Sequence, residues 1–151
     1  MTKIVPQYLV FIDFDGVTHP LPEICGTLRH LSDPRVGTTF FHPTNLSQIN
    51  RLLDALNAHG VISSSWRLDF SWKDFQPFFH GRLIGQTPWL DMTKRITEIE
   101  SFLEQNGWKH ISWVALDDMQ LIFHQRHLCC LLMVARGLPQ RMWINFLIAK
   151  T

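Results

Sequence analysis

The chain has 151 residues, a formal net charge of +1 and 46% hydrophobic residues. This length suits one domain with a substantial core, so we expect a single domain over residues 1–151. The small net charge, without a basic run, argues against strong nonspecific binding to nucleic acid but does not exclude a nucleotide substrate. The longest apolar stretch, Leu128 to Ala135, is too short to span a bilayer and is expected to form a core strand.

The cysteine pattern indicates a reducing compartment. Cys25, Cys129 and Cys130 are odd in number, two of them are adjacent, and none has the Cys-x-x-Cys spacing of a zinc site. The N-terminal residues lack the apolar region and cleavage site of a signal peptide. We therefore expect a cytoplasmic protein without a membrane partner.

The first predicted element is a buried strand over the apolar run Tyr8 to Ile12, followed by two acidic residues. Successive residues of a strand point to opposite sides, so Asp13 and Asp15 share a side and Phe14 points away. Gly16 then permits a sharp turn. Two close carboxylates repel each other unless one is protonated or a cation lies between them, and a divalent metal is the natural candidate. An ordinary Asp-Gly turn would have the same local sequence, so residues elsewhere in the chain are needed to distinguish a metal site from a turn.

A helix is predicted next. Asn45 resembles its N-cap, with Gln48 three positions on, and Gly60 is expected to end it. Its apolar face repeats at intervals of three and four residues, at Leu46, Ile49, Leu53 and Leu56.

The third element is a strand that begins at Val61 and ends in hydroxyls and a guanidinium. Ser63 and Ser64 are candidate ligands for an anion. Arg67 either binds a second phosphate or pairs with a carboxylate, and the sequence favours neither. A helix near Ser71 to Phe79 is expected next, whose clustered aromatic residues are expected to be core, with a base-stacking platform as the alternative.

After a short strand over Arg82 to Gly85, a helix opened by Lys94-Arg95 is predicted to end at Gly107. The strand after it ends in a second acidic pair, Asp117-Asp118. The Leu128 strand and a helix opened by Pro139 complete an alternation typical of an α/β sheet with parallel strands. Ligands of such sheets bind outside the carboxyl ends of the strands, so the acidic pairs and the hydroxyls are expected to form one site for a metal and a phosphate.

In this order, the motifs resemble those of haloacid dehalogenase-like (HAD) hydrolases. The chain is most similar to small HAD domains associated with phages and RNA-repair proteins, over Tyr8 to about Leu147. The third family motif, a Lys near the start of a helix, is the weakest match: Lys94 fits best, and Arg95 and Lys73 are alternatives. The other matches are Asp13 to Val17 for the first motif, Ser64 (or Ser63) for the second and Asp117-Asp118 for the fourth.

The resemblance implies a three-layer Rossmann-like fold, with a mainly parallel sheet and helices on both faces. The segments Thr18 to Pro43 and Thr87 to Thr93, where the family inserts cap domains, are short, so we expect a minimal cap or none.

By the same resemblance, the chain is a Mg²⁺-dependent phosphatase that acts through an aspartyl phosphate. Asp13 would be the nucleophile and Asp15 the general acid and base. Ser64 and Lys94 would bind the phosphoryl oxygens. The Mg²⁺ ligands implied are Asp13, the main-chain carbonyl of Asp15, Asp117 and, directly or through water, Asp118.

The substrate expected is a phosphomonoester: a phosphorylated small molecule, a nucleotide or a nucleic-acid end. Two alternatives stay open. One is a phosphatase dedicated to processing nucleic-acid ends, and the other is a non-catalytic module that accepts or binds phosphate.

Overall fold

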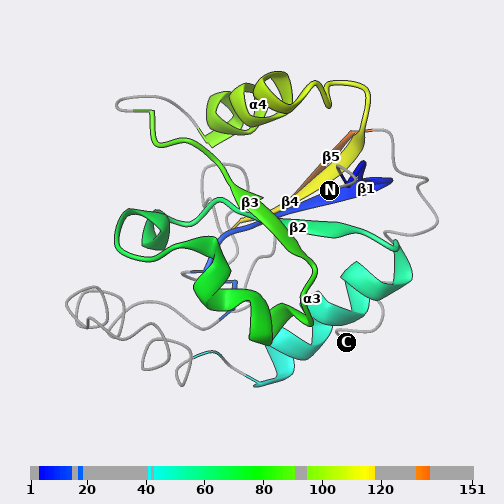
Figure 1. Cartoon of the computed structure of the whole chain (residues 1–151). Helices are drawn as coiled ribbons and strands as arrows, with labels where there is room; N and C mark the ends of the chain where they lie inside the picture. The colour runs from blue at the N-terminus through cyan, green and yellow to red at the C-terminus, as the bar shows by residue number, and fades with distance from the viewer. Residues whose placement is uncertain are drawn as a thin grey trace.

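The computed structural model describes residues 4–14, 17–18, 41, 43–90, 95–117 and 132–136, of which 43–45 and 132–136 are described by their backbone alone. Its centre is a five-stranded sheet in the order β3-β2-β1-β4-β5 (Figure 1). The first four of these strands are parallel, and β5 pairs with β4 in the antiparallel direction. The strands are β1 (Tyr8–Ile12), β2 (His59–Ile62), β3 (Leu83–Gln86), β4 (Ser112–Asp117) and β5 (Leu132–Arg136).

Strand β1 lies in the middle of the sheet and is covered on both faces. Val10 and Ile12 belong to one hydrophobic cluster, and Leu9 and Phe11 belong to a second cluster on the other face. A strand buried on both faces reads as a continuous apolar run, which is what Tyr8 to Ile12 shows. The central position of β1 brings the residue that follows it, Asp13, to the middle of one sheet edge.

Helices cover the two faces of the sheet (Figure 1). Helix α3 (Pro43–Ala55) and the 3₁₀ helices η1 (Ser65–Leu68) and η2 (Trp72–Phe79) contribute to the first cluster, and α4 (Arg95–Asn106) contributes to the second. This arrangement confirms the predicted three-layer α/β fold with a mainly parallel sheet.

The predicted boundaries of α3 were wrong at both ends. The helix begins at Pro43, so Asn45 lies within its first turn, and it ends at Ala55 rather than at Gly60. Asn57, with a φ of 46°, makes the left-handed turn that leads out of it. Gly60 lies in β2, where an added Cβ would come within 2.7 Å of Leu83 Cδ2, so close packing explains this glycine. By contrast, Gly107 follows α4 with a φ of 71°, as predicted.

The remaining predicted elements that fall on described residues are found with small shifts. The segment after Ser71 is a 3₁₀ helix with a capping box, and its aromatic side chains Phe75 and Phe79 are fully buried, so their core role is confirmed. The last strand occupies Leu132–Arg136, which overlaps the predicted run from Leu128 to Ala135, and residues 128–131 lie outside the described residues. The predicted helix from Pro139 and most of the segment from Thr18 to Pro43 lie outside the described residues, so the minimal cap stays a prediction. No helix in the described part of the chain is long and apolar enough to cross a membrane.

Phe14 anchors the turn that follows β1. Its side chain is fully buried, opposite Asp13 as the strand alternation predicted, and its ring centroid lies 4.9 Å from that of Phe75 and 5.4 Å from that of Trp66. Its carbonyl oxygen accepts hydrogen bonds from the main-chain N–H of Val17 (3.0 Å) and of Thr18 (2.9 Å). One residue therefore ties the end of β1 both to the aromatic core and to the turn.

We predict that Phe14→Ala lowers the free energy of unfolding by about 3–5 kcal/mol, because it leaves a cavity among well-packed rings. Denaturant unfolding followed by circular dichroism measures this loss. Val5→Ala, at a residue that is 69% exposed, is the control and should change stability little. Equal losses in the two variants would contradict the anchoring role of Phe14.

Candidate active site

Asp13 directly follows β1 at the carboxyl edge of the sheet. Its main-chain N–H donates to the carbonyl oxygen of Leu116 on β4, at 3.0 Å, which continues the ladder between the two strands. Its Oδ1 accepts a hydrogen bond from the N–H of Phe14 at 2.9 Å. The carboxylate is buried, and its orientation is set by the backbone that the Phe14 ring anchors.

Asp117 lies beside Asp13. Ile12 and Leu116 are register partners in the parallel ladder, so the residues that follow them stand on neighbouring strands, about 4.8 Å apart in a regular sheet. Asp117 is also buried. Two of the four predicted carboxylates are therefore neighbours at the edge of the sheet where the sequence expected them.

The guanidinium of Arg95, the first residue of α4, contacts both carboxylates. Its Nη2 lies 3.9 Å from Asp13 Oδ1, and its Nε lies 3.4 Å from Asp117 Oδ2. The Arg95 side chain is 23% exposed, against 7% for Asp13 and 9% for Asp117, so it reaches the pair from the solvent side. Arg95 offsets the repulsion between two buried negative charges.

Two polar atoms of this group are buried without a hydrogen bond among the described residues: Arg95 Nη1 and Asp117 Oδ2. Buried polar atoms are almost always hydrogen-bonded, so a donor and a carboxylate oxygen that lack hydrogen bonds to the described residues suit a ligand, although the oxygen also has the 3.4 Å contact with Arg95 Nε. An anion would satisfy the donor, and a cation would satisfy the oxygen.

The serines of the second motif follow β2, the neighbour of β1 on its other side. Both Ser63 and Ser64 are buried. Ser63 continues the ladder by donating its main-chain N–H to the carbonyl oxygen of Ile12, at 3.0 Å. Ser64 is the N-cap of η1, where its Oγ accepts from the N–H of Trp66 at 3.2 Å. That bond uses an oxygen lone pair and leaves the Ser64 hydroxyl proton available to a phosphate.

Arg67 is bound to protein rather than open to a second phosphate. Its guanidinium has five N–H donors, and the structure gives each a partner, so no donor is left for a ligand. The acceptors are the carbonyl oxygens of Ser63 (2.7 Å), Ser64 (2.6 Å), Thr87 (3.0 Å) and Pro88 (3.4 Å) and Oε2 of Glu98 (2.6 Å). Of the two alternatives, pairing with a carboxylate is therefore the one found.

The Arg67–Glu98 pair joins three parts of the site. It links the loop after β2 and the loop after β3 to α4, and the second oxygen of Glu98 accepts from the N–H of Leu90 at 3.3 Å. Burial lowers the pKa of the Arg67 guanidinium, and the charge and hydrogen bond of the neighbouring Glu98 carboxylate oppose that shift. Glu98 was not predicted from the sequence, where its signal was an acidic residue next to Ile99 on the apolar side of the helix.

Three predicted site residues, Asp15, Lys94 and Asp118, lie outside the described residues, so their roles stay predictions. Lys73, one alternative for the third motif, is exposed on η2, with its Nζ 5.8 Å from the centre of the Trp72 ring. Arg95, the other alternative, is the described cation that contacts the two aspartates.

A family model described as the HAD domain in Swiss Army Knife RNA repair proteins matches residues 9–138. The chain belongs to this family. Neither a curated protein nor a solved structure shows a significant match to the chain. Membership of this HAD family confirms the resemblance seen in the sequence motifs and supports a HAD-type hydrolase.

The described residues fit a hard divalent cation. Asp13 and Asp117 offer carboxylate oxygens, the ligands that Mg²⁺ prefers, and Asp117 Oδ2 lacks a hydrogen bond among the described residues. No group of three or more His, Cys, Asp or Glu side chains that could hold a metal is found in the described part of the chain, and Asp15 and Asp118 lie outside that part.

We predict that Arg67→Met destabilises the protein by at least about 3–5 kcal/mol, the loss expected when one partner of a buried pair is removed. The variant leaves the buried Glu98 carboxylate without its cation and leaves the carbonyl oxygens around residue 67 without their hydrogen-bond donor. Glu98→Gln should cost less, because an amide oxygen still accepts from Arg67. Chemical denaturation of both variants measures the difference.

The matched control is the exposed pair Lys109–Glu104, whose side chains are 67% and 69% exposed. Lys109→Met should cost less than about 1 kcal/mol. If Arg67→Met were no more destabilising than Lys109→Met, the buried pair would not hold the site together.

Proposed function

We propose that this chain is a Mg²⁺-dependent phosphatase that removes a terminal phosphate from a nucleic-acid strand through an aspartyl phosphate on Asp13. The observation that carries the proposal is the contact of the Arg95 guanidinium with both Asp13 and Asp117, at the carboxyl ends of two adjacent parallel strands. Carboxylates and a fixed cation around one point suit a phosphoryl group and its metal ion.

Asp13 is the proposed nucleophile. One carboxylate oxygen forms a bond to phosphorus as the bond between phosphorus and the leaving oxygen breaks. The Phe14 N–H holds Oδ1 of Asp13 in place, so the carboxylate is oriented before the substrate arrives. The result is an acyl phosphate on Asp13 and a free hydroxyl on the nucleic acid.

Asp15 is the proposed general acid and base. It donates a proton to the leaving oxygen in the first step and takes a proton from the attacking water in the second. The water oxygen bonds to phosphorus, the bond from phosphorus to Asp13 breaks, and inorganic phosphate leaves. Asp13 and Asp15 are then restored for another turnover.

The remaining groups offset negative charge. Ser64 and Lys94 are the proposed ligands of the phosphoryl oxygens, and we assign the same task to Arg95, whose buried Nη1 makes no hydrogen bond to the described residues. Asp13, the main-chain carbonyl of Asp15, Asp117 and Asp118 would hold Mg²⁺. When bound, this ion lowers the repulsion among the carboxylates and between them and the phosphate.

The choice of substrate rests on the family. Its description names RNA repair proteins, in which a phosphate at a strand end is a natural target. The small net charge fits recognition of an end better than tight binding along a duplex. Multiple turnover distinguishes this proposal from the alternative of a non-catalytic module that accepts or binds phosphate.

We predict that Asp13→Asn lowers turnover by at least about 10⁴-fold while the fold is kept, because the amide has nearly the same shape but does not attack phosphorus. Phosphate release from a phosphorylated oligonucleotide, a mononucleotide and a small aryl phosphate measures the loss. Glu104→Gln, an exposed carboxylate far along α4, is the matched control and should keep full activity.

More than about one hundredth of the wild-type rate in a folded Asp13→Asn protein would exclude Asp13 as the nucleophile. A wild-type protein that releases at most one phosphate per chain would favour the non-catalytic module instead.

We predict that Mg²⁺ raises the melting temperature and is required for turnover. An ion present at 100 times its dissociation constant would stabilise the folded state by about 2.7 kcal/mol. Thermal melts and rates with Mg²⁺ or with excess chelator measure both effects. Asp117→Ala should abolish the Mg²⁺-dependent rise in melting temperature, whereas full activity in excess chelator would contradict the metal assignment.

A further inference from the structure

Trp89 exposes a large aromatic side chain at the carboxyl edge of the sheet. It lies in the segment that follows β3, and 49% of its surface is accessible to solvent. A single exposed apolar side chain is ordinary by itself. Trp89 differs from that ordinary case in two respects: a buried cation holds its ring in place, and the ring lies on the side of the sheet to which Asp13 points.

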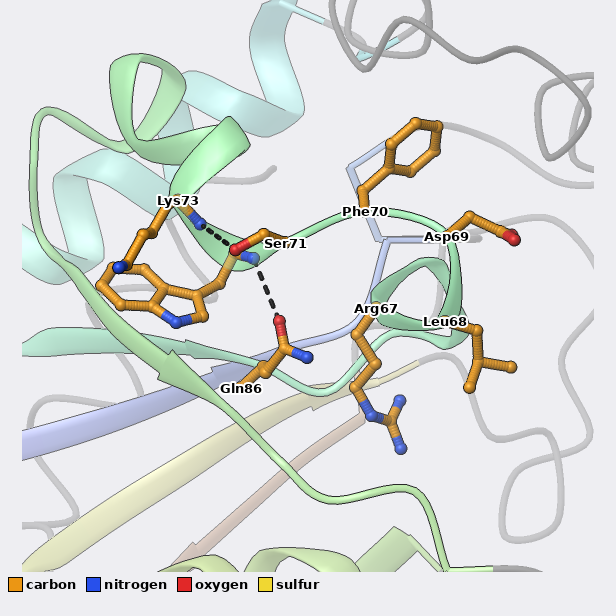
Figure 2. A pocket seen from close by; sticks show the side chains of 8 residues that line it. Arg67, Leu68, Asp69, Phe70, Ser71, Lys73 and Gln86 are labelled. Atoms are coloured by element: carbon orange, nitrogen blue, oxygen red, sulfur yellow. Dashed lines mark hydrogen bonds between the residues drawn. The ribbon is translucent and has the colours of Figure 1, made fainter.

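The buried cation is the guanidinium of Arg67. The centroid of the Trp89 ring lies 5.3 Å from Arg67 Cζ, which is a cation–π contact. Figure 2 shows the Arg67 side chain pointing from η1 toward the segment that follows β3, where it donates to the carbonyl oxygen of Pro88. After Trp89, the N–H of Leu90 donates to Oε1 of Glu98 at 3.3 Å. The indole therefore projects from a backbone that is bound on both sides of it.

The segment that carries Trp89 runs toward α4, on the face of the sheet to which the Asp13 carboxylate points (Figure 1). Asp13 comes two residues after Phe11, which belongs to the hydrophobic cluster under α4, so strand alternation gives both side chains the same side. The contact between Arg95 of α4 and Asp13 agrees with this direction. Trp89 and the Asp13 carboxylate therefore share one face of the sheet.

The hollow beside β3 opens on the opposite face. Its volume is about 520 Å³, and its lining includes Arg67, residues of η1 and of the turn into η2, and Gln86 (Figure 2). Side chains of η1 and η2 pack with Phe14, which points away from Asp13. A group attached to a phosphate at Asp13 would therefore extend along the Trp89 side rather than into this hollow.

Arg67 and one strand spacing separate Trp89 from Asp13. Arg67 Nη1 donates to the carbonyl oxygen of Ser63 at 2.7 Å, and Ser63 follows β2 beside Asp13, about 4.8 Å away in a regular sheet. Besides burial, which lowers the pKa of Arg67 most, Arg95 lowers that pKa and Asp13 raises it, so both charges act on the guanidinium. The sugar of one nucleotide can bridge the gap between a phosphate at Asp13 and a base on the indole.

An indole held in this way suits a nucleobase. Stacking on an aromatic ring tolerates any base, because every base has a π face. A ring that is already fixed loses little conformational entropy when a base stacks on it. Since the carboxylates and Arg95 offer a place for the phosphate on the same side, both parts of a terminal nucleotide have partners there. A phosphate ester of an aliphatic alcohol would leave the ring unused.

We propose that Trp89 stacks on the terminal base of a nucleic-acid strand whose terminal phosphate lies at Asp13, and so favours nucleotide ends over other phosphomonoesters. The inference rests on the proposed phosphatase function and deepens it, since it names the residue that recognises the substrate. Trp89 determines specificity in this role: it contacts the base and takes no part in the transfer of the phosphoryl group.

The test compares two oligonucleotides that differ only at the phosphorylated end, where one carries a base and the other an abasic sugar. Both are prepared with a 5′-terminal and, separately, with a 3′-terminal phosphate. We expect the wild-type protein to prefer the base-ended strand in kcat/KM by about 5- to 150-fold, the gain expected from one stacked base. Trp89→Leu should bring this ratio close to one, and Trp89→Phe, which keeps a smaller ring, should retain part of the preference.

Leu68→Ala is the matched control, because it also removes exposed apolar surface next to Arg67, but on η1. It should leave the ratio unchanged, and melting temperatures show whether each variant folds. If Trp89 only covers Arg67, Trp89→Leu lowers both rates equally and keeps the wild-type ratio, which would overturn the inference. Should Trp89→Leu fail to fold, Trp89→Phe carries the test, because an unchanged preference with the smaller ring would also overturn it.

Binding of the two labelled strands to Asp13→Asn protein, measured by fluorescence anisotropy, separates this inference from the proposed function. If neither strand is hydrolysed, but the base-ended strand binds more tightly and adding Trp89→Leu removes the difference, the phosphatase function fails and the stacking site stands. If neither measurement distinguishes the two strands, or if Trp89→Leu and Leu68→Ala leave the same preference, the stacking site is wrong whether or not phosphate is released.

Discussion

The buried guanidinium of Arg67 is the interaction on which the carboxyl edge of the sheet depends. It replaces water for the carbonyl oxygens of Ser63, Ser64 and Thr87, which would otherwise be unsatisfied where β2 and β3 end. Its ion pair with Glu98 fastens that edge to α4. Taking one charge out of water is costly, but here every donor of the arginine has a partner, and the cost is offset.

The hydrogen bonds and the ion pair of Arg67 affect the structure on both of its sides. Glu98 lies one helical turn from Arg95, so the pair fixes the end of α4 that brings a cation to Asp13 and Asp117. On its other side, Arg67 forms a wall of the hollow beside β3. Arg67 therefore belongs both to the wall of this hollow and to the network that holds α4.

The fold was predictable from the sequence because its signals are local. The apolar run from Tyr8 to Ile12, the four-residue spacing of Ile99 and Leu103 and the glycine at position 107 each specify an element through neighbouring residues. The predictions that were wrong concern residues whose role depends on contacts distant in sequence. Gly60 resembled a helix end, but it serves the packing of Leu83 against β2, and no local pattern carries that information.

The candidate site divides in the same way. The sequence by itself determined that acidic residues follow two strands, because strand alternation and the acidic pairs are read within a few residues. Only the tertiary structure decided that Asp13 and Asp117 are neighbours, that Arg95 contacts both and that Arg67 pairs with Glu98. The physical reason is that which carboxylate or carbonyl oxygen an arginine side chain contacts depends on distance and burial. Both depend on how the sheet edge and α4 pack together.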